Sequence, residues 1–444
     1  MKKYMLSQSF FLRFFLHVLL YSISFSSYAQ VKTINIKDFG AKGDGITNDT
    51  KAVNAAILEA ASEGVQLVFE KNRTYLVDTV SLSGAKYKPY SRLEIIGNNA
   101  IIKCINQNKN NVLNFFFIDT LIVQDLSIYG NKNRKTNGSG MGVYYSKYCS
   151  ITGCTIQECK FSGILIAWST FAQINNNLIF NNGDGSLPTD GISIHSLAGG
   201  TISSNVIYKN NPLDTQDGDG IQIGSISSVM TGYYDPSKIQ RIKVFKNICF
   251  QHGRRGIKIQ RSKVLAEENF LSENAIGVSI VNGLLAINDI QVRSNFIQKS
   301  YKGITTEGGG NYNISNADIE RNFLSGSIMT DRILLKDASN IRVSGNVFDR
   351  HSIKVYDKKR KLVNYMNINA SNARNADSSN NSIADIAKNL SAVNFGSKTV
   401  SKEKSQEEMA MTYINAAQTN YTVPNGVINN DSVFGIFINN INWL

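Results

Sequence analysis

The hydrophobic pattern of this chain repeats a short unit in which glycine is followed by an apolar residue, any residue and a second apolar residue. Because side chains alternate faces along a strand, the two apolar residues are predicted to point into a core and the residue between them outward. The units start at Gly142, Gly163, Gly191, Gly220, Gly256, Gly277 and Gly303.

Successive units are 21 to 36 residues apart, with Asn-rich segments between them. A variable period of this length is typical of a solenoid of β coils, with insertions in the loops. A β-sandwich also has many short strands, but it does not require the same tetrapeptide in every unit. We therefore predict an all-β, single-stranded parallel β-helix. Its stacked core rows should contain Ile192, Ile194, Ile221, Ile223, Ile257, Ile259, Val278 and Ile280.

An amphipathic helix is predicted from Asn48 to Glu63, where apolar residues recur with helical spacing and polar residues provide N-cap candidates. Such a helix would cover the unpaired first coil of the solenoid. We predict four segments: residues 1–29, a cap with the first coils at 30–95, the β-helix at 96–351, and an Asn- and Ser-rich segment with a C-terminal cap at 352–444. A short helix is predicted from Ser405 to Gln418.

The first 29 residues are predicted to form a secretory signal peptide. Three basic residues, an apolar run at 14–25 and the pattern Ser27-Tyr28-Ala29 appear in that order, so the mature chain would begin near Gln30. A membrane anchor needs a longer uninterrupted apolar run. No later segment is long and apolar enough to span a bilayer. We expect a secreted, periplasmic or cell-surface location.

The chain is basic, with a net charge of +13, and +10 remains once residues 1–29 are set aside. In a secreted protein this favours an anionic polysaccharide as partner over nucleic acid, although the charge also fits a merely solubilising surface. The five cysteines are too few and odd in number for a disulfide framework. Cys149, Cys154 and Cys159 match no zinc spacing and are predicted to be core residues.

The segment from Asp38 to Thr50 resembles the opening block of the pectate-lyase and polygalacturonase superfamily of right-handed parallel β-helices, which includes glycoside hydrolase family 28. Asp44 and Asp49 within it are expected to have turn and cap roles. The superfamily contains hydrolases, lyases and phage tailspikes, so the resemblance implies the fold more firmly than the reaction.

Polygalacturonases carry coils with Asn-Thr-Asp-Gly, Asp-Asp, Gly-His-Gly and Arg-Ile-Lys. Asp190 is similar to the first aspartate, and Asp219 to the second aspartate of the pair. The remaining positions depart from the pattern, and this disfavours inverting hydrolysis, which needs two carboxyl groups about 6.5 to 9.5 Å apart. The departing residues are Gly218, Arg255, Ser279 and Val281.

Charged residues gather in three consecutive coils. Asp190, Asp219 and Arg255 precede the repeat glycine, while Gln222 and Lys258 are the outward residues two positions after it. The longest insertions lie in the same coils, where they would form the walls of a binding groove. Taken singly, each residue also fits a turn or a solvated strand face. The candidate substrate-binding residues are His195, Gln222, Arg254, Trp168, Tyr233 and Tyr234.

This set fits β-elimination on a uronic acid, in which a base removes the proton next to a carboxylate whose charge must be offset. Arg255 suits the carboxylate and Lys258 the base, with Asp190 and Asp219 completing the catalytic set. Both cations are expected on the outward face, supporting no core, so that their replacement by alanine leaves the fold intact.

Asp190, Asp217 and Asp219 are candidate Ca²⁺ ligands, because a bound cation would offset these acids and also bind the substrate carboxylate. The resemblance supports this expectation, since several β-helical lyases use Ca²⁺ together with Lys and Arg. Two alternatives stay open. One is a glycoside hydrolase that uses Asp190 with Asp217 or Asp219. The other is a non-catalytic glycan-binding or adhesive solenoid.

Overall fold

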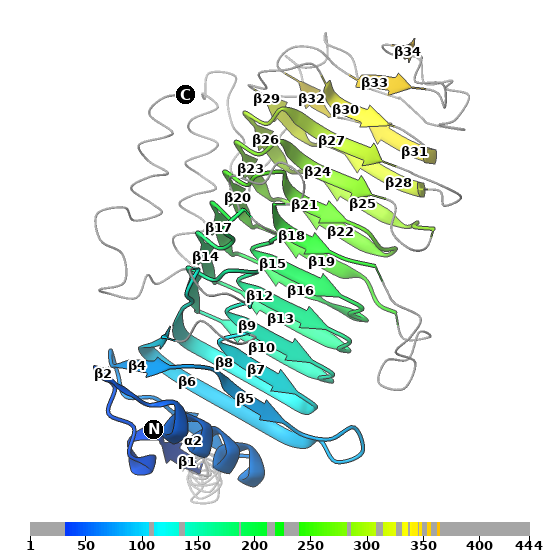
Figure 1. Ribbon diagram of the computed structural model, residues 1–444. Helices are drawn as coiled ribbons and strands as arrows, with labels where there is room; N and C mark the ends of the chain where they lie inside the picture. Colours follow the sequence, from blue (N-terminus) through cyan, green and yellow to red (C-terminus); the bar gives the residue numbers. More distant parts are fainter. Residues whose placement is uncertain are drawn as a thin grey trace, which may run out of the picture.

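The computed structural model describes residues 32–348 except for 106–110, 133–137, 186–187, 211–217, 226–238, 282–285, 308–313, 326–330, 336–337 and 345, together with 353–356 and 362–364. This part of the chain is a parallel β-helix, in which short strands stack coil upon coil along one axis (Figure 1). The fold prediction is confirmed.

Each coil contributes one strand to a first sheet and two strands to the two arms of a second sheet. In one coil these are β15 (Ile192–His195), β16 (Gly199–Ser203) and β17 (Val206–Tyr208). Each strand pairs in parallel with its equivalent in the next coil, as β15 does with β18 (Asp219–Ile223). The only antiparallel ladder among the described strands joins β33 to β34.

The first sheet contains β5 (Val80–Ser83), β7 (Leu113–Phe116), β9 (Met141–Tyr144), β12 (Ile164–Ala167), β15, β18, β21 (Arg255–Ile259), β24 (Ile276–Val281), β27 (Lys302–Glu307), β30 (Asp331–Leu335), β33 (Ile353–Tyr356) and β34 (Leu362–Asn364). One arm of the second sheet contains β1 (Thr33–Asn35), β3 (Gln66–Val68), β6 (Tyr90–Cys104), β8 (Ile118–Tyr129), β10 (Tyr148–Thr152), β13 (Phe171–Asn175), β16, β19 (Ile242–Phe245), β22 (Val264–Glu267), β25 (Ile290–Arg293), β28 (Ile314–Glu320) and β31 (Ala338–Ser344). The other arm contains β2 (Asp44–Asn48), β4 (Thr74–Val77), β11 (Thr155–Gln157), β14 (Leu178–Phe180), β17, β20 (Ile248–Phe250), β23 (Phe270–Ser272), β26 (Phe296–Gln298), β29 (Phe323–Ser325) and β32 (Val347–Phe348), and it joins the first arm through the long strands β6 and β8.

The core consists of apolar rows that run along the axis. Ile192, Ile221, Ile257 and Val278 are successive partners in the ladders of the first sheet. All eight residues predicted for the core rows have side chains that are 0% exposed, so the predicted register is confirmed. The three clustered cysteines are also buried, as predicted, and burial raises the pKa of the Cys149 and Cys154 thiols to about 12.

A ladder of buried asparagines stabilises the corner between the two arms. The side-chain amide of Asn247 donates to the side-chain oxygen of Asn269 at 3.0 Å, and the backbone N–H of Asn247 donates to the same oxygen at 3.0 Å. The same pair of bonds is repeated from rung to rung, which explains the Asn-rich segments of the sequence. The rungs are Asn177, Asn205, Asn247, Asn269, Asn295, Asn322 and Asn346.

A second, shorter ladder contains a histidine. Asn182 donates to Asn210 at 2.8 Å, and the next coil places His252 in the following position, where its backbone N–H donates to Asn274. His252 Nε2 lies 3.1 Å from the carbonyl oxygen of Ile207. Burial lowers the pKa of the His252 imidazole to about 4, so the ring is neutral at neutral pH.

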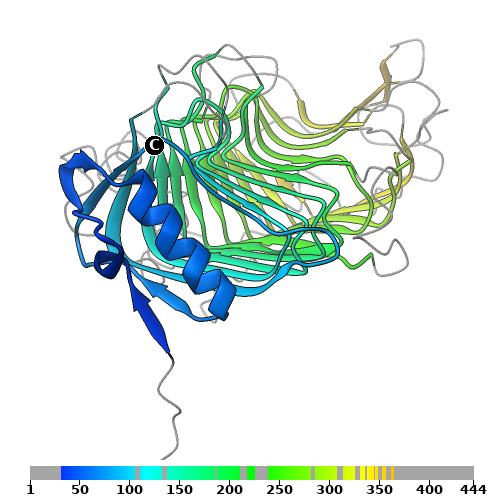
Figure 2. The same cartoon turned by 60° about the horizontal axis from the view of Figure 1, so that its bottom comes forward.

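The N-terminal end is covered by α2 (Thr50–Glu63), which lies across the first coils next to the 3-10 helix η1 (Ile36–Phe39) (Figure 2). The predicted helix is therefore confirmed, and its apolar residues Val53, Ile57, Ala60 and Ala61 are buried. Asp49 occupies the N-cap position, but its carboxylate accepts from the backbone N–H groups of Lys42 and Gly43 instead of capping the helix.

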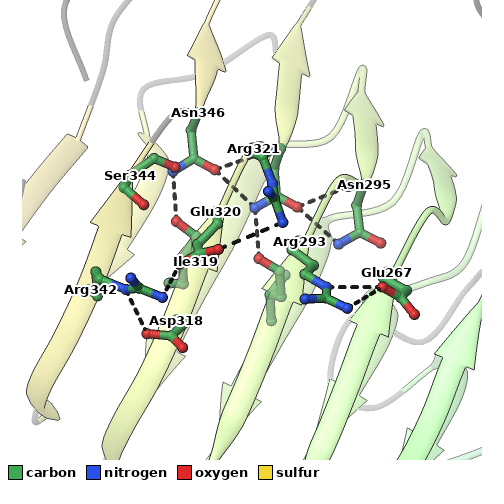
Figure 3. Close-up of polar contacts among 12 residues, drawn as sticks. Glu267, Arg293, Asn295, Asp318, Ile319, Glu320, Arg321, Arg342, Ser344 and Asn346 are labelled. Carbon is green, nitrogen blue, oxygen red and sulfur yellow. Dashed lines mark hydrogen bonds and ion pairs between the residues drawn. The ribbon is translucent and has the colours of Figure 1, made fainter. Parts of the chain in front are cut away.

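Ion pairs between neighbouring coils lie on the outer face of the second sheet (Figure 3). Arg293 contacts Glu267 at 2.9 Å, and Arg342 contacts Asp318 at 3.0 Å. Some of the basic residues of the chain therefore form ion pairs on a solvated strand face. Among the described residues no helix has the length and apolarity to cross a bilayer. The predicted signal peptide and the helix from Ser405 to Gln418 lie outside the described residues.

Candidate functional site

The candidate site lies on the outer face of the first sheet, over β15, β18 and β21. Ser193, Gln222 and Lys258 are successive partners in these strands, and the isoleucines on either side of each are in the core. Because side chains alternate along a strand, these three point outward. The predicted outward row is therefore present.

Two of the four predicted catalytic residues, Arg255 and Lys258, contact a third, Asp219. Nη1 of Arg255 lies 3.3 Å from Oδ1 of Asp219, and Nζ of Lys258 lies 3.6 Å from Oδ2 of the same carboxylate. Since Lys258 points outward, the charged groups of Asp219 and Arg255 also lie on the outer face. One carboxylate thus holds two cations from the next coil.

This cluster is buried, which corrects one expectation. Only 2% of Arg255, 5% of Lys258 and 0% of Asp219 are exposed. The two cations were expected to be removable without damage to the fold. In the structure they neutralise a buried carboxylate, and a buried charge that loses its partner is strongly destabilising.

Asp190, the fourth predicted catalytic residue, lies in the coil before Asp219. The backbone N–H of Gly191 donates to the carbonyl oxygen of Asp219 at 2.9 Å, so the two aspartates are in equivalent places in adjacent coils. Asp190 is 5% exposed. It belongs to the predicted row, one coil further from Arg255.

His195 ends strand β15 and provides a neutral imidazole beside the cluster. Its Nε2 lies 3.1 Å from the hydroxyl of Ser193. Burial and then the positive charge of Lys258 lower the pKa of the His195 imidazole, so its neutral form dominates at neutral pH. A side chain at position 224 would come within 2.8 Å of Nδ1, so Gly224 provides the room for this ring.

An aromatic ladder leads along the first sheet to the charged coils. Phe117 stacks on Tyr145 with ring centroids 4.6 Å apart, and Tyr145 stacks on Trp168 at 5.2 Å. The backbone N–H of Trp168 donates to the carbonyl oxygen of His195, which places the ladder's last ring next to the site. The following residue in this row is Ser196, so one face of the indole has no aromatic neighbour in the described coils.

The remaining predicted residues divide into two groups. The amide of Gln222 donates to Gln260 at 3.2 Å, within the outward face. Arg254 reaches Glu307, whose Oε2 lies 3.9 Å from one nitrogen of Arg254 and 3.9 Å from one of Arg255. Asp217, Tyr233 and Tyr234 lie outside the described residues.

Sequence reasoning missed Glu307. It stands four residues after the repeat Gly303, the same place that His195 occupies after Gly191. The predicted charged rows contain only the residue before the glycine and the residue two after it. Reading the row four after each glycine identifies Glu307 in the same row as His195, which is already a candidate substrate-binding residue.

The described residues do not fit a Ca²⁺ site. Among them no group of three His, Cys, Asp or Glu side chains is arranged to hold a metal ion. The carboxylate of Asp219 is already neutralised by two cations, which would repel a divalent ion. Asp217 is not described, so the calcium prediction stays a prediction and no step below depends on a metal.

A protein family agrees with this fold. The family described as rhamnogalacturonase A/epimerase, pectate lyase-like, matches residues 33–279, more than half of the chain. The chain belongs to this family. The match ends within β24, so it includes every coil of the charged cluster except that of Glu307.

The similar curated sequences cover part of the chain. Polygalacturonase-2 of Solanum lycopersicum is 28% identical over 237 residues, which is 45% of this chain and 50% of the relative. The chain therefore spans about half the length of that relative. The capsule KN3-specific depolymerase 1 of Klebsiella phage KN3-1 is 47% identical over 57 residues, 13% of this chain and 7% of the relative.

Solved structures share the fold at low identity. The endo-xylogalacturonan hydrolase of Aspergillus tubingensis has a TM-score of 0.56 at 13% identity, covering 79% of this chain and 100% of the other. The surface adhesin PfbA of Streptococcus pneumoniae has a TM-score of 0.54 at 16% identity, covering 73% and 89%. These likenesses support the β-helix and do not distinguish between reactions.

Proposed function

We propose that this member of a polysaccharide-active family is a secreted lyase that cleaves a uronic-acid-containing polysaccharide by β-elimination. The observation that carries the proposal is the juxtaposition of a neutral His195 with the buried cluster of Asp219, Arg255 and Lys258. β-Elimination needs a base for the proton next to the carboxylate and positive charge to stabilise the resulting carbanion. His195 is the candidate for the base, and Arg255 and Lys258 are the candidates for the positive charge.

The contacts favour His195 over Lys258 as the base. The nitrogen of Lys258 is engaged by the carboxylate of Asp219 at 3.6 Å, which makes it a poor candidate for the base. His195 is neutral and is held by Ser193. We therefore assign proton removal to His195, and charge stabilisation to Lys258 and Arg255.

In the proposed reaction His195 takes the proton from the carbon next to the uronate carboxylate. The electron pair released from that C–H bond forms a C=C bond as the neighbouring C–O glycosidic bond breaks. The departing oxygen then takes up a proton, for which protonated His195 is the donor in reach. The guanidinium of Arg255 stabilises the negative charge that builds up on the carboxylate.

The hydrolase alternative has less support from the geometry. Asp219 is 0% exposed and paired with two cations, which suits neither a proton donor nor a base for water. In the hydrolase alternative Asp190 acts with Asp217 or Asp219, and of these two only Asp219 is among the described residues. Hydrolysis nevertheless gives a distinct experimental outcome, and so does a glycan-binding solenoid.

The test is incubation of the purified chain with a panel of uronic polymers, including pectate, alginate and glycosaminoglycans. A lyase produces ultraviolet absorbance from the new C=C bond together with reducing ends. A hydrolase produces reducing ends alone, and a binding protein produces neither. Reducing ends without absorbance would refute the proposal.

The assignment of the base is tested by variants and by pH. His195→Gln should abolish turnover, whereas Lys243→Ala, which removes an exposed lysine from β19, should leave it unchanged. Because the pKa of His195 is lowered, the acid limb of kcat/KM should have its midpoint below 6.5. A limb with its midpoint in the alkaline range would point back to a lysine base.

A further inference from the structure

Glu307 is the loosely held member of the charge network. Its Oε2 is 3.9 Å from a nitrogen of Arg254 and 3.9 Å from a nitrogen of Arg255, and its side chain is 30% exposed. It ends β27, two coils beyond Arg255 in the first sheet. A distance of 3.9 Å exceeds that of a hydrogen bond, so the contact is electrostatic only.

Asp219 holds the same guanidinium in a different way. Its two oxygens accept from Nη1 of Arg255 at 3.3 and 3.4 Å, and the side chain is completely buried. Two carboxylates that contact Arg255 are thus held differently: Asp219 is fixed, whereas Glu307 is partly exposed and loosely bound. A partly exposed ion pair with this geometry adds little stability, so the second carboxylate is readily displaced.

We propose that Arg254 and Arg255 form a subsite for the carboxylate of a uronic acid, and that Glu307 occupies it until substrate binds. This inference rests on the proposed function and adds a residue to it. Guanidinium groups match the geometry of carboxylates, and Glu307 presents the same chemical group as the expected ligand. Glu307 is therefore an internal competitor that sets the affinity for the acidic sugar.

The exposure of the side chains favours replacement of Glu307 by a substrate carboxylate over replacement of Asp219. Arg254 is 31% exposed, comparable with Glu307, whereas Asp219, Arg255 and Lys258 are buried. A carboxylate that arrives from solvent meets Arg254 and Glu307 first. Displacement of Glu307 leaves Asp219 to neutralise the buried ends of Arg255 and Lys258.

The experiment compares the full chain with Glu307→Gln, which removes the charge and preserves the shape. Binding of polygalacturonate, alginate and hyaluronate is measured by calorimetry, with neutral dextran as a control ligand. The variant should bind its acidic polymer about two- to fivefold more tightly, the range for loss of a partly exposed ion pair. Binding of dextran should not change.

Glu267→Gln is the matched control variant. It also removes one negative charge from a partly exposed ion pair, the pair with Arg293 on the second sheet (Figure 3). It therefore has the same effect on net charge but lies on a different sheet. Equal tightening in both variants would show a general charge effect and would overturn the subsite.

The other outcomes are also decisive. Weaker binding or lower kcat in Glu307→Gln would show that Glu307 positions Arg255, and unchanged binding would show no competition; both overturn the proposal. If no acidic polymer binds either form, the subsite is refuted as well. Tighter binding without any new C=C absorbance would keep the subsite and refute only the lyase reaction.

Discussion

The buried pair of Asp219 and Arg255 allows a quantitative test of the site. Arg255→Gln would remove one of the two cations that contact a carboxylate that is 0% exposed, while Lys258 stays at 3.6 Å. Removing one partner of a buried pair costs about 3 to 5 kcal/mol, because the remaining buried charge is shielded from water and has lost a counter-ion. Asp219→Asn should cost a similar amount, since it leaves Arg255 and Lys258 buried together.

The double variant should cost clearly less than the two single variants together. In the double variant neither Asp219 nor Arg255 remains as a buried charge without the other, so the coupling free energy should be about 2 kcal/mol or more. The assay is urea unfolding at pH 7, followed by circular dichroism. The pair of Glu267 and Arg293 is the control, and its coupling should be about 0 to 1 kcal/mol because both side chains are partly exposed.

One result would refute this reasoning. If Arg255→Gln costs less than about 1 kcal/mol and the coupling equals that of the control pair, the cluster is solvated. The original expectation, that both cations can be replaced without effect on the fold, would then be correct. Loss of turnover in Arg255→Gln without loss of stability would also show that Arg255 acts in the reaction and not in the fold.

Three further predictions concern other parts of the molecule. Asn247→Ala should lower the free energy of unfolding in urea by about 2 to 4 kcal/mol, because it leaves the backbone and side-chain donors of Asn205 without their acceptor. Asn288→Ala, at an exposed position, should have no effect in the same assay. The pKa of His252 falls from 6.5 to about 4 on folding, so only the unfolded state is protonated between these pH values. The free energy of unfolding should therefore decrease by about 3 kcal/mol as the pH falls through this range. In His252→Asn the urea midpoint should not show this part of the pH dependence. Trp168→Ala should raise KM about tenfold at constant kcat in steady-state kinetics if its indole face binds a sugar ring, and an unchanged KM would assign the ladder to packing alone.

The sequence by itself determined the strands and their register. The repeated glycine and apolar pair placed Ile192, Ile221 and Ile257 in one core row, because the alternation of faces is a local property of a strand. The amphipathic helix was equally local. The same rule placed Lys258 on the outer face, next to Gln222 in the preceding coil.

Only the tertiary structure decided how the charged side chains use that face. Asp219 and Arg255 are 36 residues apart, and the insertion between them does not reveal whether their side chains meet or are buried. Position within the repeat gives the direction of a side chain but not its reach. The long side chains of Arg254 and Arg255 extend across two coils to Glu307, and the neutral state of His195 depends on burial and on Lys258 from another coil. Such contacts depend on the stacking of the whole solenoid, which no local pattern encodes.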